Sequence, residues 1–144
     1  MAITTNAICN SFKKELLEAK HNFSNPGGNS FKLAMYGTPA TLGKSTTSFT
    51  TGGQVTSPSG YTSGGKALVN VGTSLATNTA ITDFADLSFV GVTLTARGAL
   101  IYNDTNADKA VAVLDFGGDK TATAGTFTIQ FPAFTTSAAI LRIA

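Results

Sequence analysis

Apolar and polar positions alternate with a period of two over much of the chain, the spacing typical of β-strands with one buried face. The segment 31–36 shows this pattern clearly and is bounded by Gly28 and Gly37. Further strand candidates are residues 66–71, 79–84, 87–95, 98–103, 109–116, 126–131 and 138–143. Short strands separated by turn residues, with no helical pattern between them, predict a mainly β fold. We expect an antiparallel β-sandwich or a jelly-roll-like barrel.

One segment, residues 5–23, has the period of a helix instead. Its apolar positions recur at spacings of three and four and form one stripe, made of Ile8, Phe12, Leu16, Ala19 and Phe23. Thr4 or Thr5 is the expected cap at the start, and the turn at 25–29 ends the segment. An isolated helix of this length is marginal in water, so the stripe must pack on something. That partner is either the sheet of its own domain or a neighbouring subunit.

Residues 45–65 are dominated by Ser, Thr and Gly, and their large apolar side chains are Phe49, Val55 and Tyr61. A segment this long without strand or helix signals is either a solvated surface loop or an extended arm. Such an arm would lie on its own domain or on a neighbouring subunit. The length of 144 residues fits one β-rich domain, 1–144, that carries the helix 5–23 and the loop or arm 45–65.

The composition removes several classes of function. Hydrophobic residues make up 42% and charged residues 12%, with a net charge of +2. Such a chain is neither a disordered charged tail nor, on electrostatic grounds, a nucleic-acid partner. No stretch approaches the roughly 18 apolar residues of a membrane span, and the N-terminus lacks a secretion signal. We therefore expect no membrane partner and synthesis in a cytoplasm. The single cysteine, Cys9, excludes an intrachain disulfide and a cysteine zinc cluster.

The segment 37–45 superficially matches a phosphate-binding loop, with a possible magnesium ligand at Asp115. The glycines of that motif need four residues between them, and here Gly37 and Gly43 enclose five. The motif must also open into a helix, and the sequence after Ser45 is a poor helix former. Nucleotide binding is therefore not expected.

Two further candidate sites are equally weak. Asp104, Asn106 and Asp108 have the spacing that begins a calcium loop, but Lys109 stands where that loop needs Gly. We read this segment as a hairpin connection. His21 is expected at the C-terminal end of the helix, where an imidazolium complements the dipole, and Cys9 is expected as a small buried hydrophobe. The sequence thus predicts no catalytic, cofactor-binding or metal site, and no enzyme.

The C-terminal half resembles a family of small virion structural proteins of tailed bacteriophages. The resemblance rests on the runs ARGALIYND (96–104), KAVAVLDFGGDK (109–120) and TAGTFTIQF (123–131). It extends upstream to 31–35 and 60–65, and the segment 10–20 suits the same group. These motifs are signatures of a fold rather than of a chemical activity.

The resemblance implies a non-enzymatic structural protein of the virion. The leading expectation is a capsid cement or decoration protein that bridges major capsid protein subunits and itself forms a homo-oligomer. In that role apolar anchors would contact neighbouring subunits, and the candidates are Phe12, Leu16, Phe49 and Tyr61. Packing within the chain's own core is the competing role, and it is favoured for Phe12 and Leu16.

Two other functions remain open from the sequence. A tail-associated part, such as an adaptor, tube or fibre component, shares the composition but occurs in few copies. A carbohydrate- or receptor-binding module is also compatible with a β-sandwich. Sugar binding favours exposed aromatic side chains, however, and the chain has no Trp and three Tyr.

Overall fold

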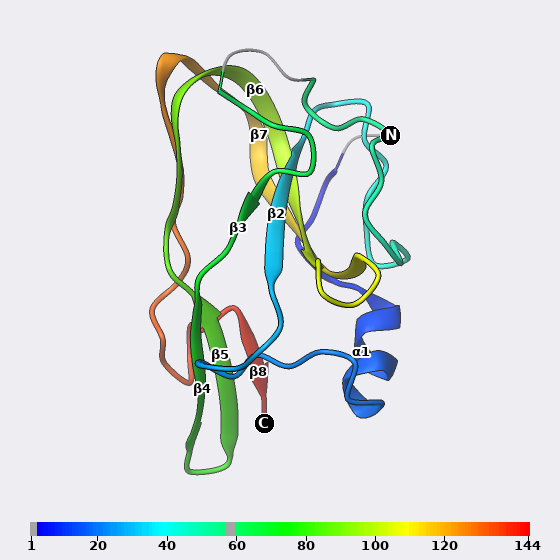
Figure 1. Cartoon of the computed structure of the whole chain (residues 1–144), viewed down its shortest axis with the longest axis vertical. Coiled ribbons are helices and arrows are strands. Elements are labelled where there is room, and N and C mark those ends of the chain that lie inside the picture. Colours follow the sequence, from blue (N-terminus) through cyan, green and yellow to red (C-terminus); the bar gives the residue numbers. More distant parts are fainter. Residues whose placement is uncertain (1–2, 57–59) are drawn as a thin grey trace.

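The computed structural model describes residues 3–56 and 60–144 and consists of two antiparallel sheets and one short helix (Figure 1). In chain order the elements are β1 (Ala7–Ile8), α1 (Asn10–Leu17), β2 (Phe31–Tyr36), β3 (Lys66–Ala67), β4 (Asn70–Ala76), β5 (Thr79–Phe84), β6 (Leu87–Asn103), β7 (Lys109–Ile129) and β8 (Leu141–Ile143). The larger sheet has the order β1-β7-β6-β2-β3 and the smaller one β4-β5-β8. The prediction of a mainly β, antiparallel fold with one N-terminal helix is confirmed. Both sheets keep open edges, so the architecture is a sandwich rather than a closed barrel.

The dominant feature is the long β6–β7 hairpin. Each of its strands was predicted as two shorter ones, 87–95 with 98–103 and 109–116 with 126–131. The ladder instead runs on through register shifts between Phe89 and Val92, Val92 and Leu94, and Ala96 and Gly98. Such bulges bend a strand without ending its pairing. The hairpin turns over at one end of the molecule (Figure 1), so its two halves contribute to opposite layers.

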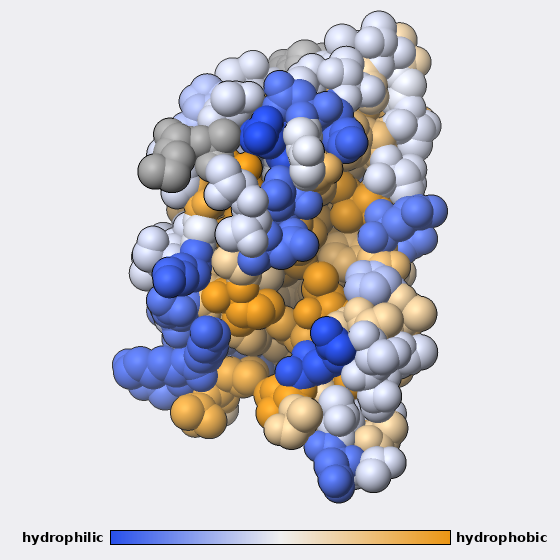
Figure 2. All heavy atoms as spheres, turned by 180° about the vertical axis from the view of Figure 1, so that it is seen from behind, coloured by the Kyte–Doolittle hydropathy of each residue, from blue (hydrophilic) through white to orange (hydrophobic). Residues whose placement is uncertain are grey.

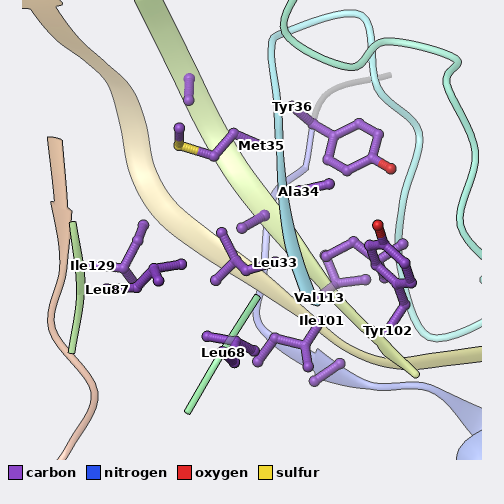
Figure 3. Close-up of a cluster of buried hydrophobic side chains, with 14 of the residues drawn as sticks. Leu33, Ala34, Met35, Tyr36, Leu68, Leu87, Ile101, Tyr102, Val113 and Ile129 are labelled. Carbon is purple, nitrogen blue, oxygen red and sulfur yellow. The ribbon is translucent and has the colours of Figure 1, made fainter. Parts of the chain in front are cut away.

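The core lies between these layers. Leu33 and Met35 of β2 are fully buried, and Leu87 and Ile129 from the far end of the hairpin face them across the interior (Figure 3). One hydrophobic cluster therefore includes residues from α1, β2, β5, β6 and β7. Strand β2 is buried along nearly all its length, because the 45–65 segment lies beside it.

A chain of phenylalanine rings connects the two sheets. Phe23 stacks on Phe31 with ring centroids 4.4 Å apart and an interplanar angle of 5°. Phe31 contacts Phe84 of the smaller sheet at 5.7 Å, and Phe84 contacts Phe131 at 5.6 Å. Phe12 of α1 joins this chain through Phe23, at 6.0 Å. Aromatic burial on this scale stabilises the junction between helix and sheets.

The predicted helix 5–23 is too long at both ends. Ala7 and Ile8 pair with Val113 and Ala112 of β7, so a sheet contact outweighs the helical pattern there. The N-cap is Cys9, without a side-chain cap, rather than Thr4 or Thr5. At the other end Ala19 adopts a φ of 58°, and this left-handed residue ends the helix. Phe23 is buried as predicted, but from an extended segment.

The segment 45–65 packs on its own domain wherever the structure describes it; residues 57–59 lie outside the described part. The chain's three tyrosines hold it there. The Tyr36 hydroxyl donates to the Thr50 carbonyl (2.6 Å) and that of Tyr102 to the Gly64 carbonyl (2.6 Å). The Tyr61 hydroxyl accepts from the Met35 amide (2.9 Å). Burial raises the pKa of all three hydroxyls, so they stay protonated donors at neutral pH.

Candidate functional site

An apolar groove of about 1100 Å³ lies between α1 and the β4-β5-β8 sheet. Phe12, Leu16 and Leu17 line its helical wall, and β5 and β8 form the opposite wall. Figure 2 shows apolar surface gathered on the lower half of one face, with polar side chains around it. Contiguous apolar surface with polar residues around it is one of the features of protein-binding sites.

The register of the smaller sheet explains its apolar wall. Leu75 pairs with Ala80, and Ala80 pairs with Ile143, so these three side chains form one row on the same face. Leu141, two positions along β8 from Ile143, shares that face and packs against the core. Leu75 is 71% exposed and Ile143 59%, because the lower end of this sheet extends past the body of the domain. On the helical wall Leu17 is 91% exposed.

The charge of the groove is one-sided. Lys13 lines it from the helix, and Arg142 borders it from β8 with its side chain on the opposite face of that strand. Ala144 also lines it, and among the described residues no Asp or Glu side chain does. The nearby Glu18 is paired with Lys14 on the same helix, at 3.2 Å. Neither Lys13 nor Arg142 forms an ion pair with any residue in the described ranges. The charged side chains at this groove are therefore both cationic.

A buried polar network supports the floor of the groove, where His21 lies. The side chain of His21 is fully buried, and its Nε2 is 3.2 Å from Glu15 Oε1. The other carboxylate oxygen of Glu15 is 3.2 Å from Lys109 Nζ. Asn103 is also fully buried, and its Nδ2 is 3.0 Å from His21 Nδ1. The network ties the helix and the segment after it to the tip of the β6–β7 hairpin.

The hydrogen bonds around Asn103 fix the tautomer of His21. Asn103 Oδ1 accepts from the backbone amides of Thr105 and Asn106, so the amide nitrogen must face the imidazole. His21 Nδ1 is then an acceptor, and Nε2–H donates to Glu15. Burial lowers the pKa of His21, against the opposing effect of Glu15. His21 is thus a neutral structural residue, not the predicted imidazolium at a helix end.

This arrangement gives a pH dependence with a definite sign. The unfolded chain protonates His21 near its ordinary pKa of 6.5, and the folded chain does so at a lower pH. The contribution of His21 to the free energy of unfolding is fully present above pH 6.5. It is lost as the pH falls through the lower pKa of the folded state. We expect a slope of at most about 1.4 kcal/mol per pH unit. Denaturant titrations between about pH 8 and about pH 5 will measure it. The variant His21→Gln should lack this part of the pH dependence. An equal slope of stability against pH in both proteins would contradict the assignment to His21.

The four residues proposed as anchors lie in different places. Phe12 and Tyr61 are each 3% exposed and belong to the chain's own core, and Phe12 also lines the groove from the helix. Phe49 is half-buried and stacks on Tyr102, with ring centroids 4.8 Å apart. Leu16 is half-buried and lines the groove. Of the two placements left open for 45–65, the described part lies on its own domain, where Tyr61 is buried and Phe49 stacks on Tyr102.

The chemical motifs of the sequence do not assemble into a site. The segment after Gly43 forms a turn closed by Thr46, and no helix follows it in the described stretch up to residue 56. Asp104 lies at the hairpin connection, as predicted, where it pairs with Lys32 at 3.7 Å. Cys9 is fully buried as expected, and burial, with Glu15 nearby, raises the pKa of its thiol to about 11. Across the described residues, no three His, Cys, Asp or Glu side chains are grouped to hold a metal ion.

The groove contains residues that the sequence did not single out. Leu17 and Ile143 come from opposite ends of the chain, and their exposure depends on how α1 and β8 are placed. Asn103 was assigned to a strand end and turn, with no signal for its buried hydrogen bonds. Glu15 was given no role from the sequence, yet its side chain turns inward to His21 and Lys109.

Comparisons with models of protein families, with curated proteins and with solved structures found no match to this chain. Within the described ranges no helix is long and apolar enough to cross a membrane.

Proposed function

We propose that this chain is a non-enzymatic structural protein of a phage virion, and specifically a capsid cement or decoration protein that bridges major capsid protein subunits. The observation that carries the docking role is the apolar groove, with Leu17 and Ile143 exposed on its two walls. The assignment to a virion rests on the resemblance of residues 96–131 to phage structural proteins. The buried Cys9 thiol and the neutral, structural His21 agree with a role that needs no reaction chemistry.

The three tyrosines bear on the carbohydrate-binding alternative. Tyr36, Tyr61 and Tyr102 are at most 3% exposed, and the chain has no Trp. A sugar ring would thus find no exposed Tyr or Trp to stack on. A docking role through the groove is the better supported function.

We expect the protein to occur on purified particles in a copy number commensurate with the major shell protein. Quantitative mass spectrometry of the particles measures this ratio. A few copies per particle would instead favour an adaptor, tube or fibre component of the tail. Absence from particles would overturn the virion assignment.

We further expect the double variant Leu17→Asp, Ile143→Asp to bind particles at least about tenfold more weakly, because each change puts a charge into a buried apolar contact. The matched control is Val90→Asp, since Val90 is 72% exposed and does not line the groove. Sedimentation of particles with added protein gives the bound fraction. Equal binding of the double variant and the control would contradict docking through the groove.

A further inference from the structure

We infer that the groove binds an extended segment of a partner protein, in which apolar and acidic residues alternate, as a fourth strand beside β8. The inference rests on the proposed function only in taking the groove as the docking surface. It adds the conformation of the bound segment and its chemical pattern, which a docking role alone does not specify.

The open edge of β8 provides the backbone contacts. The sheet order β4-β5-β8 leaves β8 with a strand on one side, and its other edge pairs with no strand among residues 3–56 and 60–144. In Figure 1 that edge lies on the side of α1, where the groove opens. Unpaired amides and carbonyls along a strand edge are a ready template for an added strand. The helix then covers one face of that strand.

The side chains of β8 set the pattern of the bound segment. Leu141 and Ile143 point to the groove face, while Arg142 between them points to the opposite face. A strand paired with β8 places its residues opposite these three on the same faces. Apolar residues are therefore favoured opposite Leu141 and Ile143, and an acidic residue opposite Arg142. One guanidinium nitrogen of Arg142 donates to the Ser137 carbonyl (2.8 Å), and its other donors remain for a carboxylate.

Charge also argues for a different protein rather than a second copy. A two-fold pairing of two β8 edges centred on Arg142 places the two guanidinium groups opposite each other on the same face. No Asp or Glu side chain lines the groove to offset that repulsion. A segment carrying carboxylates has the complementary charge, with Lys13 on the helical wall as a second cation for its flank.

Three fluorescein-labelled peptides test this inference by fluorescence anisotropy. The first peptide alternates Val and Glu, and the second alternates Val and Lys. The third is the first peptide with Pro in place of its central Val. Proline removes an amide donor and fits poorly in a paired strand, while the charge stays the same. We expect the Val-Glu peptide to bind at least about tenfold more tightly than either of the others.

Two charge-reversal variants test where the peptide binds. Arg142→Glu should weaken the Val-Glu peptide about tenfold and strengthen the Val-Lys peptide. Lys120→Glu changes the net charge equally, but Lys120 lies on β7 and does not line the groove, so its affinities should match those of the original protein. Hydrogen exchange of the Leu141–Ile143 amides should slow when the Val-Glu peptide is bound.

Several results would overturn the inference. These are equal affinity for the Val-Glu and Val-Lys peptides, full affinity of the proline peptide, or equal effects of Arg142→Glu and Lys120→Glu. Self-association of the unchanged protein that Leu17→Asp, Ile143→Asp abolishes would make a second copy the occupant and would overturn it too. Peptide binding without particle binding would reject the proposed virion role and leave the inference standing. Particle binding without peptide binding would overturn the inference and leave the proposed virion role standing.

Discussion

Gly65→Ala is expected to lower the free energy of unfolding by about 3–4 kcal/mol, the largest effect of a single methyl group in this protein. Gly65 has a φ of +80°, and an added Cβ would overlap the carbonyl oxygen of Leu33 and lie 2.8 Å from Ala34 Cα. Both neighbours belong to β2 and are fully buried, so the backbone cannot move aside cheaply. Thermal unfolding should show a midpoint lower by about 10 °C.

Gly117→Ala is the matched control for this steric argument. Gly117 has nearly the same φ, +78°, but an added Cβ meets nothing within 4 Å. The left-handed conformation alone costs about 1 kcal/mol, and we expect no more than that. If both variants lost the same stability, the contact of the 65–67 segment with β2 would not be the cause.

Asn103→Ala has the second largest expected effect, a loss of about 3 kcal/mol. Its amide nitrogen donates to His21 and to Asn29 Oδ1, each at 3.0 Å, and its oxygen accepts from two backbone amides. Removing the amide leaves the buried His21 Nδ1 without its donor and takes the acceptor from the two backbone amides of the turn. Chemical denaturation monitored by circular dichroism measures the loss. Asn78→Ala, on the exposed β4–β5 turn, should be nearly neutral.

Asn103→Asp separates the role of the network from that of packing. The aspartate keeps the shape and the oxygen that accepts from Thr105 and Asn106, but it presents an acceptor to His21 Nδ1. A protonated His21 then donates to carboxylates on both sides. We expect the slope of stability against pH below neutrality to reverse in sign. An unchanged slope would show that His21 is not held by Asn103.

The sequence predicted two strands with their observed ends, β2 and β5. Clear turn residues flank both, so local signals and tertiary structure agree. The long strands were divided instead: β7 because Gly117-Gly118-Asp119 looked like a turn, and β6 between residues 95 and 98. Gly98 lies within β6, and close packing requires glycine there, because an added Cβ would overlap the Leu114 carbonyl oxygen and come 2.7 Å from Ile3 Cδ1. A glycine required by close packing and one required by a turn look the same in a sequence.

The helix was mispredicted for a different reason. The spacing of Ile8, Phe12 and Phe23 is helical, yet their burial has three separate causes: pairing with β7, the helix stripe itself, and stacking on Phe31. Local periodicity cannot separate these contributions. The groove was equally hidden, because its walls meet only after residues from both ends of the chain are brought together.

The turned-over β6–β7 hairpin makes the two layers of the sandwich parts of one ribbon. In a sandwich built from separate strands, one layer can loosen while the other persists. Here the strands of one layer continue directly into the other, so both layers share the β6–β7 ladder of hydrogen bonds. We expect the amides of both layers along this ladder to lose protection from hydrogen exchange together. Such a hairpin is expected to unfold as one cooperative element and not as two independent layers.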